Sequence, residues 1–440
     1  MTIFEGARRV AIWGYGREGR AALTWLAARH PHLPVTILND GPLEEAPAGV
    51  ETLIGAQGAQ ALARGDFDVV VKSPGVSLYR PEVAQAKAAG ARFTSGVNLW
   101  FADNPGAHTI AVTGTKGKST CVRLIHHLLR AAGRDVALIG NVGVPPLGQT
   151  PGRDHTVLEL SSYQIADLEA APDVAMVTNL YVDHTPWHGS VAQYHHDKLR
   201  LLDDPRTRAV LNAGSEKLAA AVGGRANTVW YGEAAGFHAR DGRLYCGAQE
   251  IEVANFPLRG AHNLENLAGV CALLDALGVE GVRRRVDLAG FAQLRHRQEE
   301  FRGADGRLCV NDSISTVPEA TLGALRAYGD EKIVLFLGGA DRGQDHGDLL
   351  AFLAEHPPAV LVLLPDTGAR IAQEMAAQEK AGRVWTFPVV AAASLAQGVA
   401  AARAQAPADA VFLLSPAAPS FGHFRDFEAR GDAFIALCKG

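Results

Sequence analysis

The 440-residue chain has only five cysteines, and no two of them form a Cys-x-x-Cys pair. An odd number of scattered cysteines argues against a disulfide framework and a zinc ribbon, and it predicts reduced thiols in the cytoplasm. No apolar run reaches the roughly 18 residues that a membrane-spanning helix needs, and residues 1–9 lack the apolar region of a signal peptide. We therefore expect neither a membrane span nor export.

The sequence also lacks long runs of basic residues, and its formal net charge is −5. Proteins that bind nucleic acid usually present basic patches to its phosphate backbone, and this sequence has no such runs. Nucleic acid is therefore not an expected partner. Apolar residues are plentiful at 48%, with 20% charged residues. This composition is typical of α/β proteins with large cores, and the length favours two to four domains.

An apolar strand, a glycine-rich turn and a helix follow one another in His108-Thr-Ile-Ala-Val-Thr-Gly-Thr-Lys-Gly-Lys-Ser-Thr120. Gly114 and Gly117 allow backbone N–H groups to point inward. Lys118 supplies a positive charge, and Ser119 offers a hydroxyl to magnesium at the start of a helix over 119–132. The pattern predicts a site for a nucleoside triphosphate. Only two residues separate the glycines, fewer than in the common G-x-x-x-x-G-K-[ST] loop, so an ordinary strand-to-helix turn is the alternative.

A second glycine pattern, Gly14-Tyr-Gly-Arg-Glu-Gly19, follows an apolar strand over 9–13 and opens a helix. The next strand ends at Asp40, where a carboxylate could bind a ribose. NAD would fit this pattern, but any nucleotide diphosphate could lie on the helix N-terminus, and we favour another nucleotide. A third strand ends in Ser73-Pro-Gly75, at the sheet edge where such folds bind ligands.

Short apolar strands at 135–140, 156–160, 174–180 and 209–213 follow the phosphate loop and predict a parallel sheet covered on both faces. Glu159 lies in one of them and is a candidate magnesium ligand. The alternative is a partly exposed strand residue. Histidines at 184, 188, 195 and 196 could suggest zinc. Pro186 and the lack of an H-x-x-E-H order argue against zinc, so we expect most of these side chains to be structural.

A third α/β segment follows Gln298, with strands expected at 308–310, 332–337, 359–364, 384–387 and 410–414. Polar turns lie at the ends of several of these strands, where ligands bind. We therefore predict an α/β protein of three domains: a Rossmann-like N-terminal domain over 1–103, a central P-loop-type parallel-sheet domain over 104–297, and a Rossmann-like C-terminal domain over 298–440.

Several motifs together, in this order along the chain, resemble the Mur ligase family. They are Thr113-Gly-Thr-Lys-Gly-Lys-Ser-Thr120, Glu159-Leu-Ser-Ser162, Asp183-His184 with Lys198, His262-Asn-x-x-Asn266, His296-Arg297, Asn311-Asp-Ser313 and Leu414-Ser-Pro416. The N-terminal glycines and Lys72-Ser-Pro-Gly75 look most similar to the MurD-type branch. This resemblance implies a cytoplasmic, monomeric ligase that uses ATP to join glutamate to UDP-N-acetylmuramoyl-L-alanine, through an acyl phosphate, in peptidoglycan synthesis.

The resemblance also implies roles for individual residues. The UDP substrate would contact Gly14, Tyr15, Gly16, Arg17, Asp40, Ser73, Pro74, Gly75 and Asn141. ATP would contact Gly114, Thr115, Lys116, Gly117, Lys118, Ser119, Thr120, Asn266, Arg297 and Asp312. Two Mg²⁺ ions would be held by Ser119, Glu159, His184 and Lys198, the last as a carbamate, and Lys118, Lys198, His184 and Glu159 would be catalytic. Glutamate would contact Thr316, Arg342, Ser420 and Phe427.

One departure from the family pattern concerns the amino acid that is joined. Ile314 stands where the enzymes that add D-glutamate carry a lysine. A missing charge-assisted contact of about 1.5–3 kcal/mol demands a different binding pose, so we predict L-glutamate. The alternative is D-glutamate, with Arg342 or Arg425 supplying the charge. More distant alternatives are a folate-polyglutamate-type ligase, an NAD-dependent dehydrogenase and a non-catalytic nucleotide-binding regulator.

Overall fold

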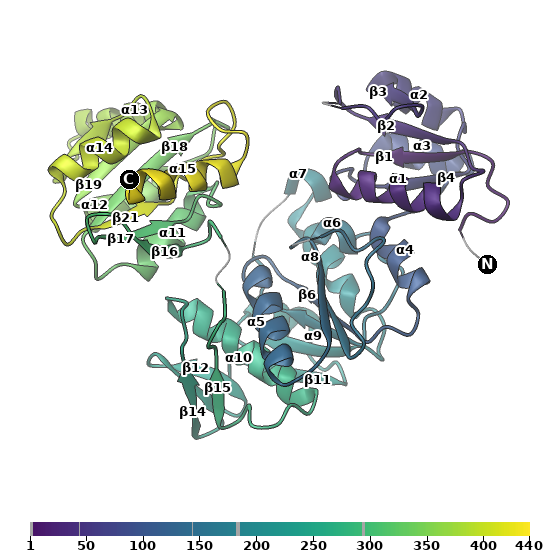
Figure 1. Cartoon of the computed structure of the whole chain (residues 1–440), viewed down its shortest axis with the longest axis horizontal. Helices are drawn as coiled ribbons and strands as arrows, with labels where there is room; N and C mark the ends of the chain where they lie inside the picture. Colours follow the sequence, from purple (N-terminus) through teal and green to yellow (C-terminus); the bar gives the residue numbers. More distant parts are fainter. Residues whose placement is uncertain (1–2, 44, 143, 182–184, 293–294) are drawn as a thin grey trace. The chain divides into compact units, whose positions relative to one another are not determined.

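The computed structural model describes residues 3–43, 45–142, 144–181, 185–292 and 295–440. The chain forms two compact units, one of Met1–Phe256 with His262–Ala289 and one of Pro257–Ala261 with Gly290–Gly440. Both combine helices with largely parallel sheets (Figure 1), so the predicted α/β fold class is confirmed. The predicted domain boundaries stay predictions.

The first sheet of unit 1 is parallel, in the order β3-β2-β1-β4-β5. Its strands are β1 (Val10–Trp13), β2 (Val35–Asn39), β3 (Glu51–Ile54), β4 (Val69–Lys72) and β5 (Arg92–Thr94). All residues of β1 and β4 are buried, because helices cover the sheet. Strand order reverses between β1 and β4, and ligands bind beyond the carboxyl ends of strands at such a point.

The second sheet of unit 1 is also parallel, in the order β11-β10-β9-β6-β8-β7. Its strands are β6 (Thr109–Thr113), β7 (Val136–Gly140), β8 (His155–Glu159), β9 (Val174–Val177), β10 (Arg208–Asn212) and β11 (Thr228–Tyr231). The buried strand β6 lies between β8 and β9, so the chain segments that follow these three strands meet at one edge.

A small third sheet completes unit 1, in the order β12-β13-β14-β15. It contains β12 (Phe237–Arg240), β13 (Arg243–Cys246), β14 (Gln249–Ala254) and β15 (Arg285–Asp287). The first three strands are antiparallel, and β15 pairs with β14 in parallel.

Unit 2 contains one sheet in the order β16-β17-β21-β18-β19-β20. Its strands are β16 (Glu299–Arg302), β17 (Leu308–Asn311), β18 (Ile333–Gly339), β19 (Val360–Asp366), β20 (Val389–Ala391) and β21 (Val411–Leu414). Only the pairing of β16 with β17 is antiparallel among these described strands. The carboxyl ends of β17, β21 and β18 are therefore neighbours.

Helices cover the sheets of both units (Figure 1). Unit 1 contains α1 (Arg17–Arg29), α2 (Ala56–Ala63), α3 (Pro81–Ala88), α4 (Gly96–Asp103), α5 (Lys118–Ala131), α6 (Ser162–Ile165), α7 (Thr185–His188), α8 (Val191–Leu199) and α9 (Glu216–Val222). Helix α10 (Ala261–Ala276) begins at the last residue of the short unit 2 segment and continues in unit 1. Unit 2 contains α11 (Pro318–Ala327), α12 (Gly347–Glu355), α13 (Thr367–Lys380), α14 (Leu395–Gln405) and α15 (Phe427–Lys439). Within the described ranges, none of the helices has the length and apolar character to cross a membrane.

One predicted strand, at 384–387, is wrong. The edge strand β20 begins at Val389, after Pro388. Val384 is 77% exposed, and Phe387 is buried in the core beneath the sheet. Pro388 has no N–H to donate to a ladder, but its carbonyl accepts from the Leu361 N–H at 2.9 Å. The apolar residues before the proline therefore belong to a connection that packs on the core.

Candidate active site

The predicted phosphate loop connects β6 to α5 in the way the sequence indicated. Gly114 and Gly117 have φ angles of +142° and +86°, which side chains disfavour. A Cβ atom at Gly117 would lie 2.5 Å from Oδ1 of Asn266, on α10. The fold thus brings Asn266, a predicted ATP contact, against the loop, and it requires glycine at 117.

The segment that follows β9 forms hydrogen bonds with the phosphate loop. Thr178 Oγ1 donates to the Lys116 carbonyl at 2.6 Å, and the Lys116 N–H donates to Asn179 Oδ1 at 2.9 Å. The Thr115 hydroxyl lies 3.0 Å from the Tyr194 hydroxyl on α8. These contacts fix the loop before any ligand binds, which preorganises its N–H groups.

Two predicted catalytic lysines converge on this loop. Lys118 Nζ donates to the carbonyls of Gly114 and Thr115, both at 3.0 Å. Lys198, which is buried on α8, donates from Nζ to the same Gly114 carbonyl at 2.9 Å. The fold therefore places two side chains that are 80 residues apart in the sequence beside one phosphate cradle.

Glu159 lies at the end of β8, paired in register with Val112 of β6. Its side chain is 1% exposed. Oε1 accepts from Asn141 Nδ2 at 2.8 Å, whereas Oε2 has no hydrogen-bond partner among the described residues. A buried carboxylate oxygen without a donor is costly unless a cation neutralises it, so the side chain fits a divalent cation near the loop.

The other predicted metal ligands stand as follows. Ser119 is buried in the first turn of α5, directly after the phosphate loop. Lys198 lies at the loop as described above. His184 lies outside the described residues.

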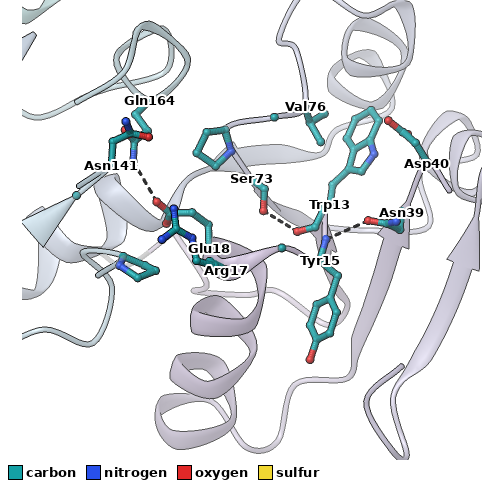
Figure 2. Close-up of a pocket in the computed structure, with 16 residues that line it drawn as sticks. Trp13, Tyr15, Arg17, Glu18, Asn39, Asp40, Ser73, Val76, Asn141 and Gln164 are labelled. Atoms are coloured by element: carbon teal, nitrogen blue, oxygen red, sulfur yellow. Dashed lines mark hydrogen bonds between the residues drawn. The ribbon is translucent and has the colours of Figure 1, made fainter. Parts of the chain in front are cut away.

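A cavity of about 400 Å³ opens beyond the carboxyl ends of β1 and β4 (Figure 2). Every residue predicted to contact the UDP substrate lines it, namely Gly14, Tyr15, Gly16, Arg17, Asp40, Ser73, Pro74, Gly75 and Asn141. The Ser73 hydroxyl donates to the Gly14 carbonyl at 2.6 Å, which joins the loops after β1 and β4. After its predicted ligand, we refer to this cavity as the nucleotide pocket.

The sequence did not predict the other residues that line the nucleotide pocket. They are Trp13, Glu18, Asn39, Val76, Gly140, Pro145 and Gln164. Figure 2 shows Glu18 turned towards Gln164, whose Nε2 donates to Glu18 Oε1 at 3.0 Å. Burial raises the pKa of Glu18. The signal for Gln164 was present in the sequence as the capping pattern Ser161-x-x-Gln164, which the structure forms at α6.

In unit 2, the predicted ATP contact Asp312 follows β17. It accepts hydrogen bonds from the hydroxyls of Ser315 at 2.6 Å and Ser415 at 2.7 Å. Burial raises the pKa of Asp312 to about 6, although these hydroxyls and the charge of Arg297 oppose the shift. Arg297, another predicted ATP contact, thus acts on the same carboxylate.

The predicted glutamate contacts lie beyond the carboxyl ends of the neighbouring strands β17, β18 and β21. Thr316 follows β17, and its carbonyl accepts from Gln344 Nε2 at 2.8 Å. Gln344 belongs to the loop after β18 that also carries Arg342, whose guanidinium lies 5.6 Å from the centre of the exposed Phe421 ring. Ser420 is buried after β21, and Phe427 begins α15.

Arg430 on α15 lies beneath these loops and was not predicted. Its side chain is 1% exposed. Nη2 donates to the Ser313 carbonyl at 2.7 Å, Nε to the Ser313 hydroxyl at 3.0 Å, and Nη1 to the Ala418 carbonyl at 2.9 Å. Burial lowers its pKa to about 10. One arginine within a helical pattern carries no sequence signal for this role.

Comparison with known proteins gives the same family as the motifs. Residues 112–274 match the Mur ligase middle domain. The UDP-N-acetylmuramoyl-L-alanine--L-glutamate ligase of Xanthomonas euvesicatoria pv. vesicatoria is 41% identical, over 99% of this chain and 96% of the relative. Its namesake in Salinispora tropica is 40% identical, over 98% and 97%.

Solved structures show the same fold. The match to MurC of Thermotoga maritima covers 97% of this chain and 98% of the MurC chain, with a TM-score of 0.58 and 18% identity. MurF of the same organism, in complex with ADP, has a TM-score of 0.58 and 14% identity over 97% of this chain and 93% of its own. Because the curated relatives match along almost their whole length, the predicted resemblance is confirmed, and the chain belongs to the Mur ligase family.

Proposed function

We propose that this chain is an ATP-dependent ligase that joins L-glutamate to UDP-N-acetylmuramoyl-L-alanine in peptidoglycan synthesis. The observation that carries the proposal is the end-to-end match to relatives with that name, at 40–41% identity. The arrangement of unit 1 supports it, because the residues predicted for UDP line one pocket and those predicted for phosphate form one loop.

The chemistry follows from the poor reactivity of a carboxylate as an acyl donor. The alanyl carboxylate attacks the terminal phosphorus of ATP to give an acyl phosphate and ADP, and the glutamate amine then attacks the acyl carbon and displaces phosphate. Lys118 neutralises charge on the transferred group, and the N–H groups of the phosphate loop orient it. Asn141 contacts both Glu159 and the nucleotide pocket, so it orients the acyl end of the substrate.

We propose that Glu159, Ser119, His184 and Lys198 would hold two Mg²⁺ ions. Bound magnesium would neutralise the phosphate oxygens during transfer. Within the described residues, no three histidine, cysteine or acidic side chains converge to hold a metal. A carbamate on Lys198 would add a carboxylate-like ligand beside the loop, in keeping with the preference of Mg²⁺ for oxygen ligands.

We propose L-glutamate as the amino acid because the loop after β17 carries Ile314 in place of a lysine, and because the relatives' names specify that enantiomer. Thr316, Arg342, Ser420 and Phe427 would contact it. Arg297, Asp312 and Asn266 would contact ATP. We also propose that the protein acts as a monomer in the cytoplasm. Light scattering coupled to gel filtration would test the oligomeric state.

The test is ADP release by the purified protein with ATP, Mg²⁺, UDP-N-acetylmuramoyl-L-alanine and each glutamate enantiomer in separate reactions. We expect sustained release over many turnovers only when L-glutamate and the UDP substrate are both present. Turnover with D-glutamate that equals or exceeds turnover with L-glutamate would overturn the enantiomer and leave the ligase. Turnover with a folate acceptor, or hydride transfer with NAD, would overturn the proposed function itself.

A further inference from the structure

Asp197 on α8 is a buried carboxylate whose partners come from several segments of unit 1. Its side chain is 1% exposed. The Tyr79 hydroxyl lies 2.7 Å from both carboxylate oxygens, and Gln193 Nε2 donates to Oδ1 at 2.9 Å. Oδ2 lies 2.6 Å from His188 Nδ1. A carboxylate with this many donors in a site of low dielectric constant is held in one place.

His188 extends the contact to the segment after β8. Because the carboxylate can only accept, the shared proton belongs to His188 Nδ1, and Nε2 accepts from the Ser162 hydroxyl at 3.0 Å. Ser162 begins α6, three residues after Glu159. The order Ser-His-Asp resembles a hydrolytic triad. Ser162 is only 2% exposed, however, so its hydroxyl cannot meet a substrate.

The loop after β4 is fastened to the same place. This loop carries Ser73, Pro74 and Gly75 of the nucleotide pocket and continues to Tyr79. Trp187, which precedes His188, donates from Nε1 to the carbonyls of Pro74 at 3.1 Å and Gly75 at 3.3 Å. In return, the Ser77 hydroxyl donates to the Trp187 carbonyl at 2.6 Å. The pocket loop is therefore hydrogen-bonded to α7 through Trp187 and to α8 through Asp197.

The next residue after Asp197 is Lys198, which donates to the Gly114 carbonyl of the phosphate loop. The Asp197 carboxylate is thus bonded on one side to the nucleotide-pocket loop. On the other side it is joined, through α8 and through His188 and Ser162, to the segments that carry Lys198 and Glu159. None of these contacts requires a ligand.

We propose that Asp197, with Tyr79 and His188, is a positioning residue. It sets the distance between the nucleotide pocket and the Lys198 side chain at the phosphate loop. It would align a ligand long enough to reach both, which is a nucleoside diphosphate sugar that carries a reactive carboxylate at its far end. The inference rests on the proposed function, because it assumes that the reacting carboxylate is tethered to the nucleotide in the pocket.

The test compares Tyr79→Phe and Asp197→Asn with Tyr328→Phe. Tyr328 also donates from its hydroxyl to a carboxylate, Glu300 at 2.9 Å, but it lies in unit 2. The control therefore removes the same kind of bond elsewhere. We expect Tyr79→Phe to lower kcat about 10-fold to 100-fold, the cost of misplacing a reacting group by roughly 1 Å. Asp197→Asn should lower it further, and Tyr328→Phe should leave it unchanged.

Binding measurements separate positioning from loss of structure. UDP alone occupies only the nucleotide pocket, so its Kd should be the same in Tyr79→Phe and the wild type, with an unchanged Tm. In the variant, ADP release should also exceed amide formation, because a misaligned acyl phosphate reacts with water to return carboxylate and phosphate. Unchanged kcat in Tyr79→Phe, or a joint loss of UDP binding and Tm, would overturn the inference. If the wild-type protein shows no turnover with UDP-N-acetylmuramoyl-L-alanine, the proposed function is overturned, and this inference with it.

Discussion

Replacing Lys118 with alanine is the most direct test of the phosphate loop. An ammonium about 4 Å from a phosphate charge interacts with it by about 4 kcal/mol at an effective dielectric constant near 20. Each 1.36 kcal/mol corresponds to a factor of ten in rate, so Lys118→Ala should lower kcat by about 1,000-fold. The fold should survive, because the Gly114 carbonyl keeps its hydrogen bond from Lys198 when the two bonds from Lys118 Nζ are lost. Their loss costs about 2 kcal/mol, against roughly 5–15 kcal/mol for a whole domain.

The assay is release of ADP with all three substrates, alongside thermal unfolding. Lys217→Ala is the matched control, since it removes the same side chain from an exposed position on α9 of the same unit. It should leave both kcat and Tm unchanged. If Lys118→Ala keeps activity within a few-fold of the wild type while remaining folded, the loop does not act on the transferred phosphate, and the reasoning fails.

Three further predictions concern the same site. Lys198→Ala should be nearly inactive and partly restored by added acetate, which can replace a carbamate; an active variant would exclude the carbamate. Gly117→Ala should weaken ADP binding, measured by calorimetry, because the new Cβ meets Asn266 in a left-handed turn; wild-type affinity would contradict this. The pKa of Asp312, about 6 when folded, lies above the roughly 3.9 of an unfolded chain. Its ionisation therefore lowers stability progressively between about pH 4 and pH 6. The difference in Tm between Asp312→Asn and the wild type should therefore be more favourable to the variant at pH 7.5 than at pH 4, and the variant should lose turnover. An equal difference in Tm at both pH values would argue against the raised pKa.

The phosphate loop and much of the nucleotide pocket could be predicted because their residues are consecutive and follow apolar strands. Gly14, Ser73 and Gly114 each lie just after a strand of four or five residues, so their places at the sheet edges follow from the strand assignments. The contact between Glu18 and Gln164 could not be predicted in the same way. It joins residues 146 positions apart, on α1 and α6, which are connected to different sheets of unit 1.

The failed strand prediction has a different physical origin. Residues 384–387 are apolar enough to resemble a buried strand, but their side chains serve two different surroundings. Phe387 packs in the core, whereas Val384 faces solvent. Because Pro388 follows, the strand pairing begins only at β20. The apolar composition therefore indicated that this segment packs on the core, but not where the strand begins.

The residues predicted to contact glutamate lie near a cation that the sequence pattern did not indicate. The absence of a lysine at position 314 suggested a loop without a cation. Arg430 nevertheless lies under the neighbouring Ser313, and within the described ranges no carboxylate forms an ion pair with it. With a pKa lowered only to about 10, it stays charged at neutral pH. This sheet edge therefore carries two cations without a lysine at 314, the buried Arg430 and the exposed Arg342 of the loop after β18.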